Sequence, residues 1–150
     1  MGWQGLLVSA IGAKTFKEQG AIGKYNQDVN ERNALTLESQ ANQLEKKKEF
    51  DIARFDKNFR KLEGETTVAL ARSGVQLGSG TAANIELANA IEAEIQRNLI
   101  EYNSKVAIAN KIEEANFARI KGVMARNEAK LAQLGTLANT STSLLTMMKT

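Results

Sequence analysis

The sequence predicts an all-α protein: a long antiparallel, coiled-coil-like helical hairpin that assembles as an oligomer. The chain of 150 residues contains no proline, which suits long uninterrupted helices. Three of its eleven glycines cluster between residues 73 and 81, and a glycine cluster between two helical patterns indicates a reversal. On both sides of this cluster apolar residues recur every three or four positions. Because two helices touching along one seam bury little area, we expect neighbouring copies to cover the remaining apolar surface.

The chain divides into three parts. An apolar, glycine-rich N-terminal segment and its joint occupy residues 1–23, the hairpin occupies 24–134 with its turn at 73–81, and a Ser/Thr-rich tail occupies 135–150. The tail has two open interpretations: a short docking helix, or a segment ordered only against a partner.

The N-terminal segment carries no charge before Lys14. It is too short to span a bilayer, which takes about 20 apolar residues. One interpretation is a peptide that docks on the helical body or on a neighbour. The other is a membrane-active segment, mobile on a flexible joint at Gly20 and Gly23. Its membrane-interacting residues would be Trp3, Leu6, Leu7, Val8 and Ile11.

The first helix is expected from Asn26 or Asp28 to about Arg72, and the second from Ala82 to about Leu134. In the second helix a heptad-like spacing of apolar residues suits a left-handed helix pair, and its register shifts near Phe117. The predicted seam between the two helices consists of Phe55, Phe59, Leu62, Ile95, Leu99, Tyr102 and Val106.

Charged residues support the antiparallel pairing. Folding the chain about residue 77 brings Glu31 close to Arg119 and Asp28 close to Arg126. The run Lys46 to Lys48 is interleaved with acidic residues, which is typical of a solvated helix face.

The turn is expected to be ordered. Gly74 can adopt the left-handed conformation that ends the first helix, and Ser79 or Thr81 can cap the second. Val75 and Leu77 are expected to pack between the helix ends. The predicted turn residues are Gly74, Val75, Leu77, Gly78, Ser79 and Gly80.

The composition argues against enzyme chemistry. The chain has no cysteine and no histidine, so zinc, haem and Ser-His or Cys-His sites lack their usual side chains. Glutamates at 92, 94, 113 and 114 lack the histidines with which helical bundles build iron sites. We therefore expect no catalytic site, no metal site and no cofactor. The net charge of +3 is too small to indicate a nucleic acid or membrane by itself.

The turn sequence, Ser73-Gly74-Val75-Gln76-Leu77-Gly78-Ser79-Gly80-Thr81, resembles a Ser-Gly-Val-x-Leu-x-Ser-Gly-Ser/Thr stretch in small internal virion proteins of short-tailed phages, the podoviruses. In that family an apolar start also precedes two long helices rich in Ala, Asn and Gln. The motif covers about a dozen residues, whereas the layout covers nearly the whole chain. Gln76 and Asn84 stand where the family often has Asp.

The resemblance implies a DNA-ejection protein without catalytic residues. Such proteins are packed in the capsid interior near the portal, as a homo-oligomeric ring with other internal virion proteins. They leave with the genome and help to form a channel for DNA across the host outer membrane. The interaction with DNA would then be non-specific passage.

Two other functions fit the same residues. The first is a fixed structural coiled-coil component, such as a tail, adaptor or scaffold protein, in which the apolar start is a docking peptide. The second is a sheath or pore subunit of a bacterial secretion apparatus, because needle proteins are also helical hairpins.

Overall fold

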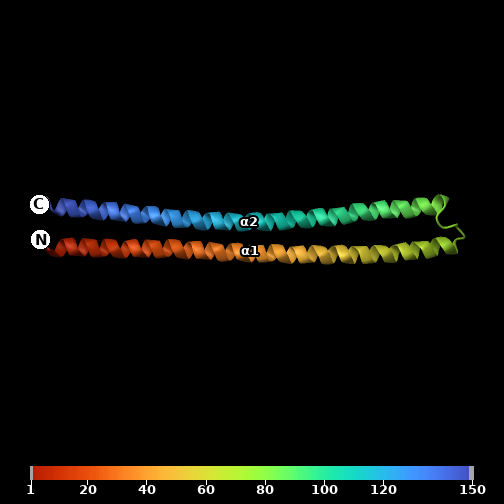
Figure 1. The fold of residues 1–150 in the computed structure, drawn as a ribbon, viewed down its shortest axis with the longest axis horizontal. Coiled ribbons are helices and arrows are strands. Elements are labelled where there is room, and N and C mark those ends of the chain that lie inside the picture. The colour runs from red at the N-terminus through yellow and green to blue at the C-terminus, as the bar shows by residue number, and fades with distance from the viewer. Residues whose placement is uncertain (1, 149–150) are drawn as a thin grey trace. The chain divides into compact units, whose positions relative to one another are not determined.

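In the computed structural model the chain forms two α-helices, α1 (Gly2–Arg72) and α2 (Gly80–Met148), which a turn at residues 73–79 connects (Figure 1). The structure describes the backbone of residues 2–148 and the side chains of residues 10–143, 145 and 146. None of the described residues lies in a β-strand. The all-α helical hairpin predicted from the sequence is therefore confirmed.

The two helices form two compact units. The terminal unit consists of Met1–Glu38 and Glu113–Thr150, and the turn unit consists of Ser39–Ile112. Within each unit a segment of α1 and a segment of α2 pack side by side in opposite directions (Figure 1).

The predicted flexible joint at Gly20 and Gly23 is wrong, as is the predicted start of the helix near Asn26. Helix α1 begins at Gly2 and continues through both glycines. Gly23 is buried, and a Cβ atom there would overlap the Cβ of Ala129 on α2. Glycine weakens a helix interior by about 1 kcal/mol, but here it lets the two backbones approach closely.

The tail is a continuation of α2 to Met148. Its hydroxyl groups bond to the helix's own backbone: Thr140 Oγ1 donates to the carbonyl of Thr136 at 2.8 Å, and Ser141 Oγ to the carbonyl of Leu137 at 2.8 Å. Serine and threonine tolerate a helix interior when they bond in this way to the preceding turn.

The seam of the terminal unit is built from small side chains. Ala34 on α1 and Ala115 on α2 are 0% exposed. A Cβ atom at Gly122 would lie 3.0 Å from the Cβ of Asn30 and 3.3 Å from the carbonyl oxygen of Gln27. Because the distance between packed helices depends on the side chains at the contact, this seam allows close packing.

The seam of the turn unit combines small and large residues. Ala41, Ala82 and Ala93 are buried, while Phe55 and Phe59 are half-buried. A shallow hollow lined by both phenylalanines also includes Ala93 and Gln96 of α2. The predicted seam residue Leu62 also lines this hollow, but it is 51% exposed.

The four seam residues predicted on α2 lie on its exposed side instead of against α1. Tyr102 follows Ala93 by nine residues, which at about 100° per residue places it on the opposite side of the helix. The heptad-like spacing therefore marks an apolar face of α2 that points away from α1, and the predicted contact of this face with α1 is wrong. Ala93 and its neighbours face α1, and the exposed residues are Ile95, Leu99, Tyr102 and Val106.

A Schellman motif ends α1. Gly74 has a φ of +75°, its N–H donates to the carbonyl of Ala71 at 3.2 Å, and the N–H of Val75 donates to the carbonyl of Leu70 at 3.2 Å. These bonds satisfy two carbonyls that the end of a helix leaves without partners. Gly78 and Gly80 also have positive φ values, of +77° and +53°.

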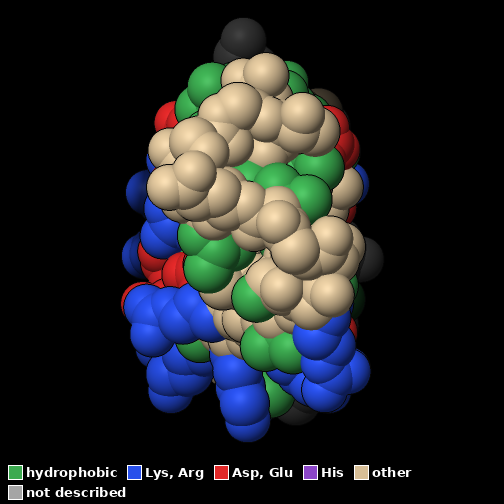
Figure 2. Space-filling model, turned by 90° about the vertical axis from the view of Figure 1, so that its right-hand side faces the viewer, with side chains coloured by type: hydrophobic (Ala, Val, Ile, Leu, Met, Phe, Trp, Pro, Cys, Tyr) green, Lys and Arg blue, Asp and Glu red, His purple; other side chains and the backbone are tan. Residues whose placement is uncertain are grey.

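The rest of the turn is solvent-exposed. Val75 and Leu77 are 37% and 45% exposed, so the prediction that they pack between the helix ends is wrong. The hydroxyl of Ser79 donates to the carbonyl of Gln76 at 3.3 Å and so closes the turn. Figure 2 views the molecule from the end where the turn lies; hydrophobic side chains show between backbone and uncharged polar atoms, and Lys and Arg side chains gather at the lower margin of the view.

We expect Gly23→Leu to destabilise the protein relative to Gly64→Leu. Both replacements raise helix propensity equally, but a Cβ at Gly64 meets no atom within 4 Å, whereas one at Gly23 overlaps Ala129. Overpacking of this kind costs about 1–3 kcal/mol. Urea unfolding followed by circular dichroism at 222 nm measures the difference, and equal stability of the two variants would refute the close contact at Gly23.

Candidate self-association surface

The outer face of α2 carries a row of large apolar side chains in the turn unit. Their exposed fractions range from 42% to 66%. Successive members are three or four residues apart, so they share one face of the helix. We call this row the turn-unit stripe; it consists of Ile91, Ile95, Leu99, Tyr102 and Val106.

The terminal unit carries a second row, which is 54% to 68% exposed. Met124 follows the buried Ala115 by nine residues, so at about 100° per residue this row also lies opposite the side that packs on α1. We call it the terminal stripe; it consists of Phe117, Ile120, Met124, Leu131 and Leu134.

The exposed area of the chain is large for its mass. The chain exposes 11260 Å², whereas a compact globular protein of the same 16.4 kDa exposes about 7,500 Å². The difference of about 3,700 Å² exceeds the roughly 800 Å² that each partner buries in a standard protein interface. Clustered apolar side chains within this area have the character of an interaction surface.

Polar contacts in the terminal unit fix which side of α2 faces α1. Arg119 of α2 pairs with Glu31 at 3.2 Å, as the sequence predicted, and its Nη1 also donates to Glu38. The hydrogen bond from Arg119 holds the pKa of the Glu38 carboxyl below its ordinary value, and the two carboxylates raise the pKa of Arg119. Arg126 Nη1 donates to Oε1 of Gln27 at 2.7 Å, in place of the predicted approach to Asp28.

Further contacts continue along the terminal unit. Gln133 donates to the carbonyl of Phe16 at 2.7 Å, and Thr136 Oγ1 lies 3.0 Å from Oε1 of Gln19. A rotation of α2 that buried the terminal stripe against α1 would break these bonds. The apolar face is therefore held outwards.

In the turn unit, Arg97 of α2 pairs with Asp56 of α1 at 3.3 Å. Other charges pair along their own helix. A hydrogen bond to Glu45 raises the pKa of Lys48, and a hydrogen bond from Lys105 lowers the pKa of Glu101. Lys46 and Lys47 are exposed, as expected for a solvated face, whereas the side chain of Lys48 is only 16% exposed and is also attracted by Glu101 of α2.

The predicted membrane-interacting residues fall within α1. The side chains of Trp3, Leu6, Leu7 and Val8 lie outside the described residues, and Ile11 is 65% exposed. In the part of the chain that the structure describes, no helical stretch has the length and apolar character needed to cross a bilayer.

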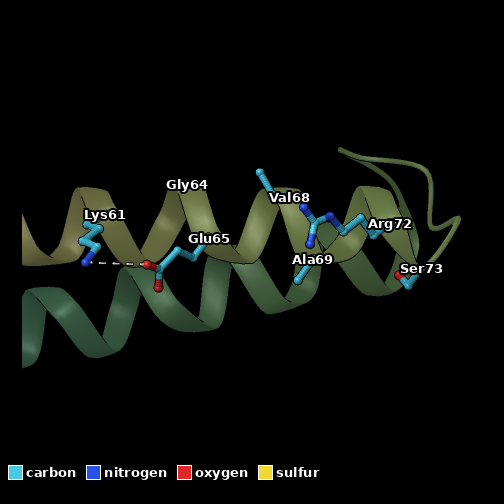
Figure 3. Close-up of a pocket in the computed structure, with 7 residues that line it drawn as sticks. All are labelled: Lys61, Gly64, Glu65, Val68, Ala69, Arg72 and Ser73. Atoms are coloured by element: carbon cyan, nitrogen blue, oxygen red, sulfur yellow. Dashed lines mark ion pairs between the residues drawn. The ribbon is translucent and has the colours of Figure 1, made fainter.

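An open hollow beside the last turns of α1 offers no convergent chemistry (Figure 3). Its two facing charges, Lys61 and Glu65, lie 3.8 Å apart, and both are mostly exposed. Val68, Ala69 and Arg72 line the rest of it along the same helix. Among the described residues, no group of three His, Cys, Asp or Glu side chains could hold a metal ion.

Comparison of the chain with protein-family models, with curated proteins and with solved structures found no match.

Sequence reasoning missed the small-residue seam, although its signal is present. Ala115, Ala118, Gly122, Ala125 and Ala129 recur at steps of three and four, which is the same periodicity as that of the apolar rows. Two faces of α2 therefore share one period. The face that packs on α1 is the one with the smaller side chains, because small side chains allow the two helix backbones to approach more closely.

We expect acid to weaken the hairpin through Glu38. Because the folded pKa of this carboxyl lies below its ordinary 4.5, the pair with Arg119 stabilises the fold above about pH 4.5, and this stabilisation is lost as the pH falls through the lower folded value. Urea unfolding measured from about pH 6 to 3 should show a shallower pH dependence for Arg119→Gln. Arg126→Gln is the matched control, since Arg126 contacts the neutral Gln27. An unchanged pH dependence in Arg119→Gln would refute the role of this pair.

Proposed function

We propose that this protein is an internal core and ejection protein of a short-tailed phage. In this proposal it is packed in the capsid near the portal as a homo-oligomeric ring beside other internal virion proteins. It is released with the genome and helps to form a channel across the host outer membrane for DNA entry. The turn sequence from Ser73 to Thr81 is the observation that carries the phage assignment.

The outer face of α2 supports the assembly part of the proposal. A subunit that must pack with its neighbours needs an apolar face that its own fold does not cover, and the two stripes provide one in each unit.

The N-terminal segment supports the membrane part. Residues 1–13 are uncharged and contain Trp3, a residue type that favours the boundary between water and lipid. Channel formation would then come from several copies acting together, with the small residues of this segment allowing close contact.

We expect the purified protein to form oligomers through the exposed face. Leu99→Gln should shift sedimentation velocity profiles towards the monomer, because a buried amide without a partner costs about 1–3 kcal/mol per copy. Leu35→Gln on α1, whose side chain is 53% exposed and lies in neither stripe, is the control and should leave the oligomer intact. A wild-type protein that stays monomeric at 100 μM would overturn the assembly part of the proposal.

Deletion of residues 1–13 tests whether this segment acts on membranes or is needed for assembly. In the ejection proposal the deletion abolishes dye release from lipid vesicles and leaves the oligomer intact. If the deletion instead abolishes assembly, the segment is a docking peptide, and the protein is a fixed structural component.

The location of the protein in phage particles tests the proposal as a whole. Mass spectrometry and immunogold labelling should find it inside full capsids and absent from particles that have released their genome. Retention on emptied particles would contradict ejection and favour a tail, adaptor or scaffold protein.

A further inference from the structure

The terminal stripe has the spacing of a two-stranded coiled coil. From Phe117 the positions 120, 124, 127, 131 and 134 follow at alternating steps of three and four, which is the heptad period of 3.5 residues. Five of these six positions are apolar, and all six are exposed. The sixth is Asn127, a neutral residue in the middle of the row.

We propose that two copies of the chain pair in antiparallel orientation through the terminal stripe, with Lys121 of each copy against Glu128 of the other. A second copy is the occupant that the stripe itself specifies, because a heptad row is complementary to another heptad row. The chain exposes about 3,700 Å² more surface than a compact protein of its mass. An interface of about 800 Å² per copy fits within this excess.

The residues that flank the terminal stripe determine whether the two copies pair in parallel or in antiparallel orientation. One edge carries Lys121 and Glu128, seven residues apart, and the other carries Asn116, Val123 and Lys130. Within the described part of the chain, neither Lys121 nor Glu128 forms an ion pair. Lys121 instead places its Nζ 5.7 Å from the ring centre of Phe117, at the margin of the stripe.

An antiparallel pair brings identical edges together. Lys121 of one copy then meets Glu128 of the second copy, and the two-fold symmetry repeats this contact, which gives two opposite-charge pairs. In the core of the pair, Phe117 lies opposite Leu134 of the second copy, and Ile120 lies opposite Leu131. Met124 lies opposite Asn127 of the second copy, so the two Asn127 side chains do not face each other.

A parallel pair brings the two different edges together. Lys121 would then approach Asn116 of the second copy, and Glu128 would approach Val123, so neither charge gains an opposite charge. In the core, Asn127 would face Asn127 of the second copy. The antiparallel arrangement is therefore the one that the charges favour.

The inference rests on the self-association in the proposed function and is independent of the phage assignment. Because the chain has no cysteine, single cysteines can report the orientation. Oxidation of an equimolar mixture of Ile120→Cys and Leu131→Cys should give mainly the mixed disulfide, because these positions lie opposite each other. Ile120→Cys alone should cross-link at least tenfold less.

Each outcome of this experiment decides something different. Strong cross-linking of Ile120→Cys to itself would show a parallel pair and overturn the inference. An oligomer that forms no cross-link in either sample would overturn the terminal stripe as the interface while leaving self-association intact. A protein that is monomeric throughout would overturn both.

A charge swap gives a second, independent readout. Lys121→Glu and Glu128→Lys should each weaken dimerisation by about tenfold, because each single change makes two like-charge contacts. The double variant should recover the affinity, since the opposite charges meet again with their positions exchanged. Lys130→Glu, on the other edge, is the control and should change the affinity by less than about threefold. Failure of the double variant to recover, with its helicity unchanged, would contradict the antiparallel arrangement.

Discussion

The close contact between α1 and α2 through small side chains is the constraint on which the rest of this structure depends. Ala34, Ala115 and Gly122 leave the helix backbones free to approach, and Gly23 fits against Ala129 with no room for a Cβ atom. Alanine and glycine bury little area, so this seam gains less from the hydrophobic effect than a seam of leucines would. The polar contacts that accompany it define which sides of the helices meet.

Arg119 is central to that definition in the terminal unit. Its guanidinium reaches two carboxylates of α1 at once, and Arg126 and Gln133 add contacts further along. Exposed contacts of this kind contribute little stability individually. Their geometric effect is larger, because together they select one rotation of α2 about its axis.

That rotation leaves the large apolar side chains of α2 outwards. Helix α2 therefore packs on α1 through small residues such as Ala93 and Ala115, and its opposite side exposes Ile, Leu, Phe, Met and Tyr side chains. Large apolar side chains that cluster outside the core of a fold have the character of an interaction surface. This exposed apolar side is the surface on which the proposed self-association rests.

The sequence by itself determined the two-helix hairpin, the position of the turn and the antiparallel pairing of Glu31 with Arg119, but not the outer ends of the two helices. These features follow from local causes: the absence of proline, the positive φ that Gly74 supplies, and the spacing of charges on either side of the turn. The sequence also revealed the apolar face of α2, but not what that face contacts.

Only the tertiary structure decided which face of α2 packs on α1, and that Gly20 and Gly23 continue a helix instead of interrupting it. Both results have one physical reason. Periodicity shows that residues share a face, but two faces with the same period can be told apart only by how closely the backbones approach. Here Ala115 and Gly122 permit an approach that Ile120 and Met124 would prevent.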